Sequence, residues 1–338
     1  MKLSFVDISA TPYQGDRKQA LRDTIETAQV IEDLGFQRIW LTEHHNHKLV
    51  AGRAPEILMA AVAENTKHIR VGSGAILLNH YSPFKVAENF ATLSELYSGR
   101  IDLGIGRATI GRFTNLALQP NRSAHQQADN STEQLVELLA WLANDFPAKH
   151  SFSQVKVYND GAVPNVFLLG SSGWSADTAA QLGLAYSFAG FFNPQQAAQI
   201  TRHYLQDFQG SDKIYAHKKP RLILGLAVFA HETDQLALEF SAPMQYFHHQ
   251  LRLTGVLSNE LAPEKEAVGL LNGSISMERM SEPAKFPKFI VGKAETVAQE
   301  LKAIKAAFGA DEIMIRIMSA NQKNKLKSLE LLTKHLQD

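Results

Sequence analysis

The chain has 338 residues, of which 45% are hydrophobic and 20% charged, as in an ordinary globular protein with enough length for a large core. Lysine plus arginine and aspartate plus glutamate both number 34, so the zero net charge favours neither nucleic acid nor an anionic membrane as a partner. The absence of cysteine excludes disulfides, thiolate metal sites and cysteine nucleophiles.

The sequence also indicates where the protein is found. The N-terminal residues 1–7 are too short and too soon polar for a signal peptide. No apolar run approaches the roughly 20 residues of a membrane span. We therefore expect a cytoplasmic protein with no membrane partner.

Short apolar runs alternate along the chain with segments whose apolar residues recur at spacings of three and four, which predicts strands followed by amphipathic helices. The predicted strands are 3–8, 36–41, 69–78, 101–105, 165–169, 184–188, 222–230 and 311–318. The predicted helices are 21–34, 55–65, 83–97, 135–142, 176–182, 195–208 and 326–336. A small hairpin is predicted around residues 152–158, where the pattern alternates.

About eight strand-and-helix alternations favour an α/β fold of the (β/α)₈ TIM-barrel type over an open doubly wound sheet. The chain exceeds the roughly 250 residues usual for this fold. The surplus predicts insertions after strand four and between strands seven and eight. No linker or composition shift marks a second domain, so we expect one domain over residues 1–338. Within the second insertion, the long polar segment 257–287 is predicted to be a mobile lid.

The ends of the predicted strands carry most of the reactive and phosphate-binding side chains. In a barrel these ends face a single opening, which is where active sites lie. The strand-end residues are Asp7, Glu43, His44, His45, Gly74, Ala75, Gly106, Arg107, Ser171, Ser172 and Gly173. We therefore expect these residues to surround one pocket.

Two of these strand ends suit a phosphate. Backbone N–H groups in Ser171, Ser172 and Gly173, placed before a helix, favour an anion through the helix dipole. Arg107 can donate two parallel hydrogen bonds to a phosphate. A plain tight turn and a structural salt bridge remain the alternatives for these two features.

The run Glu43-His44-His45 has several interpretations. Adjacent residues on a strand point to opposite faces, so the two imidazoles cannot meet at one metal ion, and we expect no metal site. General acid–base work by one histidine, oriented by a carboxylate, fits the pattern better. A histidine with a purely structural role at a strand end is the remaining alternative.

Four short motifs occur in the order seen in bacterial luciferase-like flavin monooxygenases. They are Trp40-Leu41-Thr42-Glu43-His44-His45, Val71-Gly72-Ser73-Gly74-Ala75, Leu103-Gly104-Ile105-Gly106-Arg107 and Leu169-Gly170-Ser171-Ser172-Gly173. Residues 83–100 and 289–292 also resemble the family, so the likeness spans nearly the whole chain. Each motif is short, and their order and spacing make the resemblance specific.

The resemblance implies a barrel that binds reduced FMN at its strand ends. Arg107 and residues 171–173 would hold the phosphate. The flavin ring would rest against a bulge near Gly74 and Ala75, where a non-prolyl cis peptide is expected. His44 would be the acid–base residue beside the flavin, with Glu43 positioning the site. Asp7, at the end of strand one, is grouped with the cofactor-binding residues.

The resemblance also implies partners. Many members are dimers packed through the early helices and receive reduced FMN from a separate flavin reductase, which agrees with the lack of a nicotinamide-binding fingerprint. The expected activity is oxygenation of a small organic substrate with O₂. Gly106 stands where bacterial luciferase has a reactive cysteine, so light emission is not implied. A flavin-binding protein without turnover and a deazaflavin (F420)-dependent dehydrogenase are the alternatives.

Overall fold

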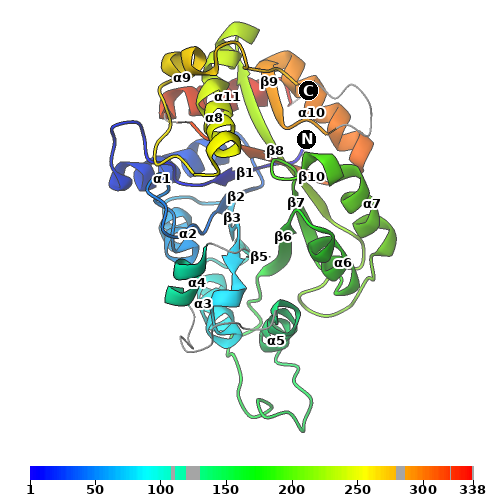
Figure 1. Ribbon diagram of the computed structural model, residues 1–338. Coiled ribbons are helices and arrows are strands. Elements are labelled where there is room, and N and C mark those ends of the chain that lie inside the picture. The colour runs from blue at the N-terminus through cyan, green and yellow to red at the C-terminus, as the bar shows by residue number, and fades with distance from the viewer. Residues whose placement is uncertain (108–110, 119–129, 279–285, 320, 337–338) are drawn as a thin grey trace.

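The computed structural model describes residues 1–107, 111–118, 130–278, 286–319 and 321–336. Parallel strands form a ring that helices surround (Figure 1). The strands of the ring are, in order, β1 (Leu3–Asp7), β2 (Arg38–Leu41), β3 (Arg70–Ser73) with β4 (Ile76–Leu77), β5 (Ile101–Gly106), β6 (Asn165–Gly170), β7 (Ala185–Ala189), β8 (Leu222–His231) and β10 (Glu312–Arg316). Because β10 pairs with both β8 and β1, the ring closes, and the predicted (β/α)₈ barrel is confirmed.

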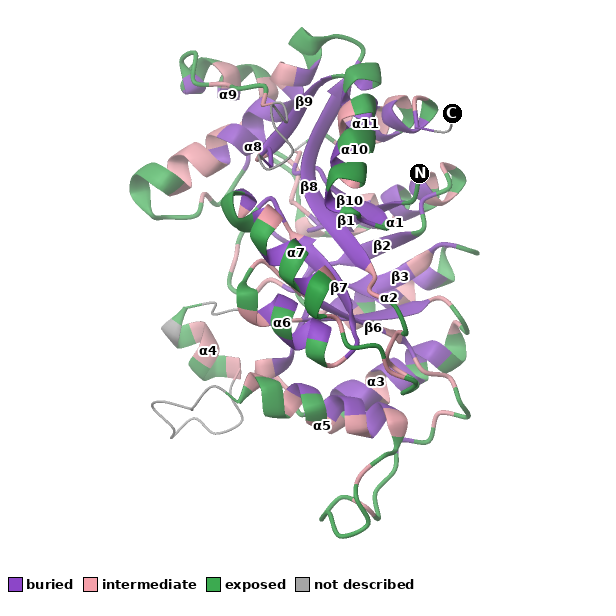
Figure 2. Ribbon diagram, turned by 90° about the vertical axis from the view of Figure 1, so that its right-hand side faces the viewer, coloured by how far each residue is buried: buried purple, intermediate pink, exposed green. Residues whose placement is uncertain are grey.

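Helices pack outside the ring, and each carries buried residues as well as exposed ones (Figure 2). These helices are α1 (Arg17–Asp33), α2 (Pro55–Glu64), α3 (Pro83–Leu96), α6 (Gly173–Gln181), α7 (Ala197–Asp207), α10 (Ala294–Phe308) and α11 (Gln322–Lys334). Side-chain caps fix several starts, as when Asp16 accepts a hydrogen bond from the Gln19 N–H at the start of α1. Gly35 follows α1 with a φ of 78°, a conformation that glycine adopts without strain.

Both predicted insertions are present. The first, after β5, holds α4 (Arg112–Leu118) and α5 (Ser131–Ala143). The second, between β8 and β10, holds α8 (Asp234–Thr254), α9 (Glu264–Leu271), β9 (Phe289–Lys293) and α10. Strand β9 was not predicted; it pairs with the last residues of β8, outside the ring. Two short 3₁₀ turns, η1 (Leu78–His80) and η2 (Pro194–Gln196), follow β4 and β7.

Each insertion contains a segment for which the sequence made a specific prediction. The predicted hairpin at 152–158 is wrong, because these residues form turns and irregular chain, with Phe152 packed against Trp141 of α5. Part of the proposed lid is a helix: α9 packs on α8 through Ala242, Ala267 and Leu271. The lid residues 279–285 lie outside the described residues, so the mobility of the segment stays a prediction.

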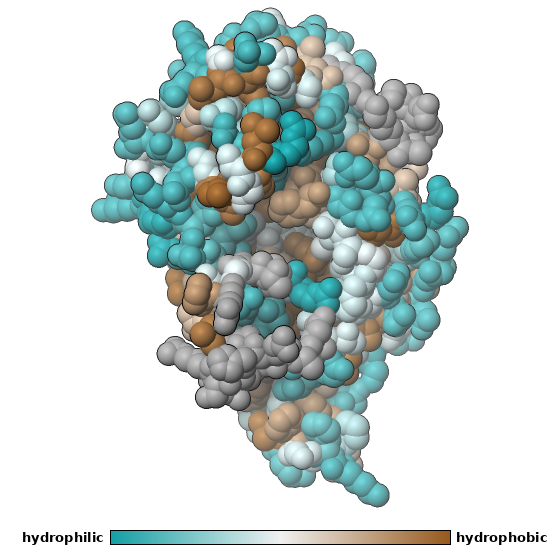
Figure 3. Space-filling view, in the orientation of Figure 1, coloured by the Kyte–Doolittle hydropathy of each residue, from teal (hydrophilic) through white to brown (hydrophobic). Residues whose placement is uncertain are grey.

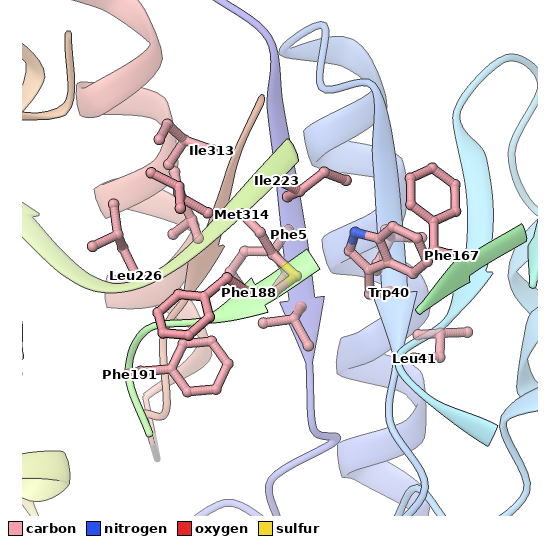
Figure 4. Close-up of a cluster of buried hydrophobic side chains, with 14 of the residues drawn as sticks. Phe5, Trp40, Leu41, Phe167, Phe188, Phe191, Ile223, Leu226, Ile313 and Met314 are labelled. Carbon is pink, nitrogen blue, oxygen red and sulfur yellow. The ribbon is translucent and has the colours of Figure 1, made fainter. Parts of the chain in front are cut away.

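Large apolar side chains from the strands form the inner core. Figure 4 shows Trp40 and Phe167 beside each other, and Phe188 and Phe191 near Met314. The rings of Trp40 and Phe167 meet edge to face with centroids 5.1 Å apart. The apolar core therefore continues across the inside of the ring, as in other barrels of this kind.

A buried ion cluster lies inside this core. The Arg38 guanidinium on β2 is 2.5 Å from Asp102 on β5 and 3.1 Å from Glu312 on β10, and all three side chains are at most 1% exposed. Arg70 also pairs with Asp102, at 2.6 Å. Arg38 further lies over the rings of Trp40 and Phe167. The cluster thus connects β2, β5 and β10, including the two strands that flank β1 at the point of closure.

The cluster generates a stability prediction. Arg38→Met should lower the free energy of unfolding by about 3–5 kcal/mol, because it leaves the buried Glu312 carboxylate without an ion-pair partner among the described residues. Urea unfolding followed by circular dichroism measures this. Lys85→Met is the matched control; it breaks a surface pair with Glu88 worth about 0–1 kcal/mol. Equal losses in both variants would contradict the account.

Candidate active site

A cavity of about 920 Å³ opens at the carboxyl ends of the ring strands. Its lining comes from the ends of β1, β2, β3, β5, β6, β7 and β10 and the residues that follow them. In the space-filling view, hydrophobic side chains are recessed near the middle of this face, in a surface that is otherwise largely hydrophilic (Figure 3). Of the predicted site residues, Glu43, His44, Gly74, Ala75, Arg107, Ser171 and Ser172 line the cavity.

Glu43 is a buried carboxylate that holds several segments together. Its Oε1 accepts hydrogen bonds from the Tyr81 hydroxyl at 2.6 Å and contacts His45 Nε2 at 2.6 Å. Its Oε2 accepts from the Leu77 N–H at 2.9 Å. Burial and the hydrogen bond to Glu43 together raise the pKa of Tyr81, so the phenol stays protonated and donates. Glu43 therefore fixes the end of β2 to β4 and to the chain after η1.

The His44 ring does not contact the Glu43 carboxylate. Its Nδ1 lies 3.0 Å from Thr42 Oγ1, which leaves Nε2 for a group in the cavity. Burial, with smaller contributions from Arg316, His47 and His45, lowers the pKa of His44 to about 4. The expectation that a carboxylate orients the catalytic histidine is therefore wrong: Glu43 contacts His45, and a threonine hydroxyl orients His44. Both contacts join residues two apart in the segment that follows β2.

The predicted bulge lies between β3 and β4. The Gly74–Ala75 peptide bond is cis, as expected. The Ser73 hydroxyl fixes the bulge to β5, because it donates to the Gly104 carbonyl at 2.8 Å and accepts from the Gly104 N–H at 2.9 Å. A Cβ on Gly106 would come within 3.0 Å of Ala75 Cβ, so the cavity wall is tightly packed here.

Arg107 and the turn after β6 meet on one side of the cavity. The Arg107 guanidinium lies 4.3 Å from the centre of the Trp174 ring, in the first turn of α6. Ser172 caps α6, accepting from the Ser175 N–H at 3.4 Å, and Gly173 is the first residue of that helix. Ser172 and Gly173 are both exposed. An arginine and a helix N-terminus are thus presented together, an arrangement that can bind an anion.

Asp7 does not belong to this group. Its carboxylate accepts from the Ser9 N–H at 2.6 Å and the Thr24 hydroxyl at 3.2 Å, and it pairs with Lys325 at 3.3 Å. Val6, its neighbour on β1, lines the cavity, so the strand turns Asp7 outward to α1 and α11. The structure therefore places Asp7 in a buried ion pair behind the barrel wall, and not among the cavity residues.

Several cavity residues were missed from the sequence. Arg316 ends β10 and is buried beneath Phe191 and Phe192, which follow β7. The signal for Arg316 was present: it is a lone arginine at the end of an apolar strand, the same pattern that singled out Arg107. The described residues contain no cluster of three histidine, aspartate or glutamate side chains that could hold a metal. Nor does any described helix have the length and apolarity to cross a membrane.

Comparison with known proteins gives the class of this barrel. The family model described as luciferase-like monooxygenase matches residues 1–312, so the chain belongs to that family. N-acetyl-S-alkylcysteine monooxygenase of Bacillus subtilis (strain 168) is 33% identical over 347 residues, covering 98% of this chain and 97% of that protein.

Solved structures show the same fold. Apo-MsnO8 has a TM-score of 0.86 and 35% identity, covering 99% of this chain and 98% of that chain. The oxygenating constituent of 3,6-diketocamphane monooxygenase from the CAM plasmid of Pseudomonas putida, solved in complex with FMN, has a TM-score of 0.71 and 19% identity, covering 99% of this chain and 97% of that chain. At that identity the second structure supports the fold alone.

The lowered pKa of His44 predicts an acid-sensitive fold. The unfolded chain takes up a proton near pH 6.5 and the folded chain only near pH 4, so acidification through this window favours unfolding. The loss attributable to His44 should approach about 3 kcal/mol by pH 4. Unfolding measured from pH 7 to 4 should therefore depend less on pH in His44→Gln than in wild type. Parallel curves for the two proteins would refute a partly buried, neutral His44.

Proposed function

We propose that the chain is a monooxygenase that uses reduced FMN and O₂ to oxygenate a small organic substrate. The observation that carries the proposal is the pairing of Arg107 with the N-terminus of α6 at the edge of a cavity that also contains His44. This arrangement has a phosphate site at one side and a proton-transfer group at another. The relative named N-acetyl-S-alkylcysteine monooxygenase supports a small organic substrate.

The residues present fit FMN. Arg107 would contact the phosphate, and the N–H groups at Ser172 and Gly173 would donate to its oxygens. Asn193 fixes the turn that presents these donors, because its side-chain amide donates to the Ser171 carbonyl at 2.8 Å. The Arg107 guanidinium is exposed and stacks on Trp174 beside the N-terminus of α6, which supports a phosphate contact.

The flavin ring would lie against the bulge at Gly74 and Ala75. A Cβ on Gly74 would come within 2.9 Å of Trp40 Cβ, and one on Gly106 within 3.0 Å of Ala75 Cβ, so this wall has no room for a larger residue at either position. When bound, reduced FMN would supply the electrons that activate O₂. The apolar part of the lining, including Leu77 and Leu169, would keep water from that reaction.

His44 would move the proton. Because its pKa is about 4, it is a neutral imidazole at pH 7 and can accept a proton at Nε2 while Thr42 orients the ring through Nδ1. Glu43 would act as a positioning residue, since both of its oxygens are engaged by Tyr81, His45 and Leu77. In this proposal His44 takes part in the reaction, and Glu43 holds the chain at the end of β2 in place.

Arg107→Ala tests the phosphate assignment. A charge-assisted contact contributes about 1.5–3 kcal/mol, so FMN affinity should fall roughly ten- to a hundredfold while riboflavin affinity stays nearly constant. Arg107→Lys should recover part of the loss, because lysine cannot make the paired contact. Flavin titrations of each variant, with melting curves alongside, measure this. An equal loss for FMN and riboflavin would remove the phosphate assignment.

His44→Ala tests the proton-transfer role. Turnover should fall about 10²–10⁴-fold, the usual contribution of a general acid–base group, while FMN affinity changes little. Tyr81→Phe is the comparison, because it removes a hydrogen bond to Glu43 and leaves His44 in place. It should lower turnover far less. An unchanged rate in His44→Ala with a defined substrate would exclude His44 from the reaction.

The proposal extends to partners. Reduced FMN would come from a separate flavin reductase, because the chain carries no nicotinamide-binding fingerprint. We further propose a single-domain, cytoplasmic homodimer packed through the early helices. Ile57 on α2 and Leu96 on α3 support this interface, since they are 72% and 66% exposed. Sedimentation of wild type against Ile57→Glu would test the dimer.

Two alternatives use the same barrel. A flavin carrier would bind FMN but show no substrate-dependent O₂ consumption above the uncoupled rate. A deazaflavin-dependent dehydrogenase would bind F420 in preference to FMN. Titration with both cofactors, followed by O₂ consumption with a substrate panel, separates the three functions.

A further inference from the structure

Arg316 lies across the cavity from the proposed phosphate site. In the ring order, β10, which carries Arg316, is four strands from β5, which carries Arg107, in either direction. The two guanidinium groups therefore come from opposite sides of the barrel opening. A phosphate held at Arg107 and α6 leaves Arg316 for a different anion.

The Arg316 guanidinium is buried without a carboxylate partner in the described part of the chain. The residue is 7% exposed, and its Nη1 has no hydrogen-bond partner among the described residues. Its other contacts are weak: Nη2 lies 3.9 Å from Met318 Sδ, and the group lies over the rings of Phe191 and Phe192 at 4.9 and 5.4 Å. Burial alone lowers its pKa to about 10, so the cation persists at neutral pH.

A buried, charged and incompletely paired arginine costs stability, which makes a purely structural role a poor explanation. We propose that Arg316 binds the carboxylate of the substrate, and that the substrate is a small organic acid with an apolar body. This inference rests on the proposed monooxygenase function and names the substrate class of the same site. The carboxylate would supply the acceptor that Nη1 lacks.

The surroundings of Arg316 favour an organic acid over an inorganic ion. Met314, Phe191 and Phe192 line the cavity beside it, and Val6 and Ile8 line it from β1. Figure 4 shows Phe191 near Met314. Phe192 is 63% exposed and stands at the entrance, over a buried charge. An apolar wall around one cation suits a molecule whose single charge is at one end.

The position also suits the reaction. The Arg316 charge contributes to the lowered pKa of His44, so the two groups lie within electrostatic range in one cavity. A substrate anchored by its carboxylate at Arg316 would extend into the space that His44 faces. The acid would thus be positioned by an ion pair, while its apolar part meets the reactive side of the site.

The test compares a carboxylate with its neutral amide. Hexanoate and hexanamide are titrated into flavin-free protein, with binding followed by ligand-observed NMR. Wild type should prefer hexanoate about ten- to a hundredfold, the effect of one charge-assisted contact. Arg316→Met should abolish the preference, and Arg316→Lys should keep part of it. Arg107→Met is the matched control and should retain the full preference.

Thermal stability and FMN affinity distinguish a substrate-binding role for Arg316 from a structural role and from a role in binding the cofactor phosphate. Because the charge lacks a carboxylate partner, Arg316→Met should melt at or above the wild-type temperature. Its FMN affinity should change less than threefold. The inference is overturned if wild type binds hexanoate and hexanamide equally, or if Arg107→Met and not Arg316→Met loses the preference. A loss of FMN affinity in Arg316→Met as large as that in Arg107→Met would assign the residue to the cofactor phosphate.

Suppose that wild type binds hexanoate no better than hexanamide, while Arg107→Ala still weakens FMN binding more than riboflavin binding. The proposed substrate class is then wrong and the flavin function stands. If both fail, the proposed function fails with it. Should Arg316→Met not fold, the acid–amide comparison in wild type, Arg316→Lys and Arg107→Met still decides the question.

Discussion

Closure of the barrel is the constraint on which the site depends. Strand β10 must pair with β1 on one side and β8 on the other before the strand ends can face a common cavity. The buried Arg38 guanidinium supports this closure, because it contacts Glu312 on β10 and Asp102 on β5 from its place on β2. Breaking that cluster would loosen the ring at its seam. Arg107 and Arg316, the two arginines that line the cavity, would then no longer be held at a fixed distance from each other.

With the ring closed, the cavity has two separate positively charged regions. One side offers a stacked arginine and the open end of α6, which together suit a phosphate dianion. The other side offers a single buried arginine among aromatic and aliphatic side chains, which suits one carboxylate. His44 follows the end of β2, which lies between β1 and β3 in the ring. Cofactor and substrate would therefore approach the proton-transfer group from different strands.

Much of the fold could be predicted from the sequence. The strands are short apolar runs that end in glycine or polar residues, and the helices have apolar residues at spacings of three and four. The ring strands agree with the prediction to within a few residues, and the cis peptide lies where the resemblance placed it. The partner of each polar side chain was harder to predict. Asp7 is at a strand end, but its side chain points away from the cavity and pairs with Lys325. Glu43 pairs with His45 and not with His44.

We propose that the cavity holds FMN with its phosphate at Arg107 and α6, which leaves Arg316 for the substrate. A crystal structure of the protein with bound FMN tests this most directly. The account predicts phosphate oxygens within hydrogen-bond distance of the Arg107 guanidinium and the N–H groups of Ser172 or Gly173, with the flavin ring against Gly74 and Ala75. A phosphate bound at Arg316, or a flavin ring away from the bulge, would contradict it.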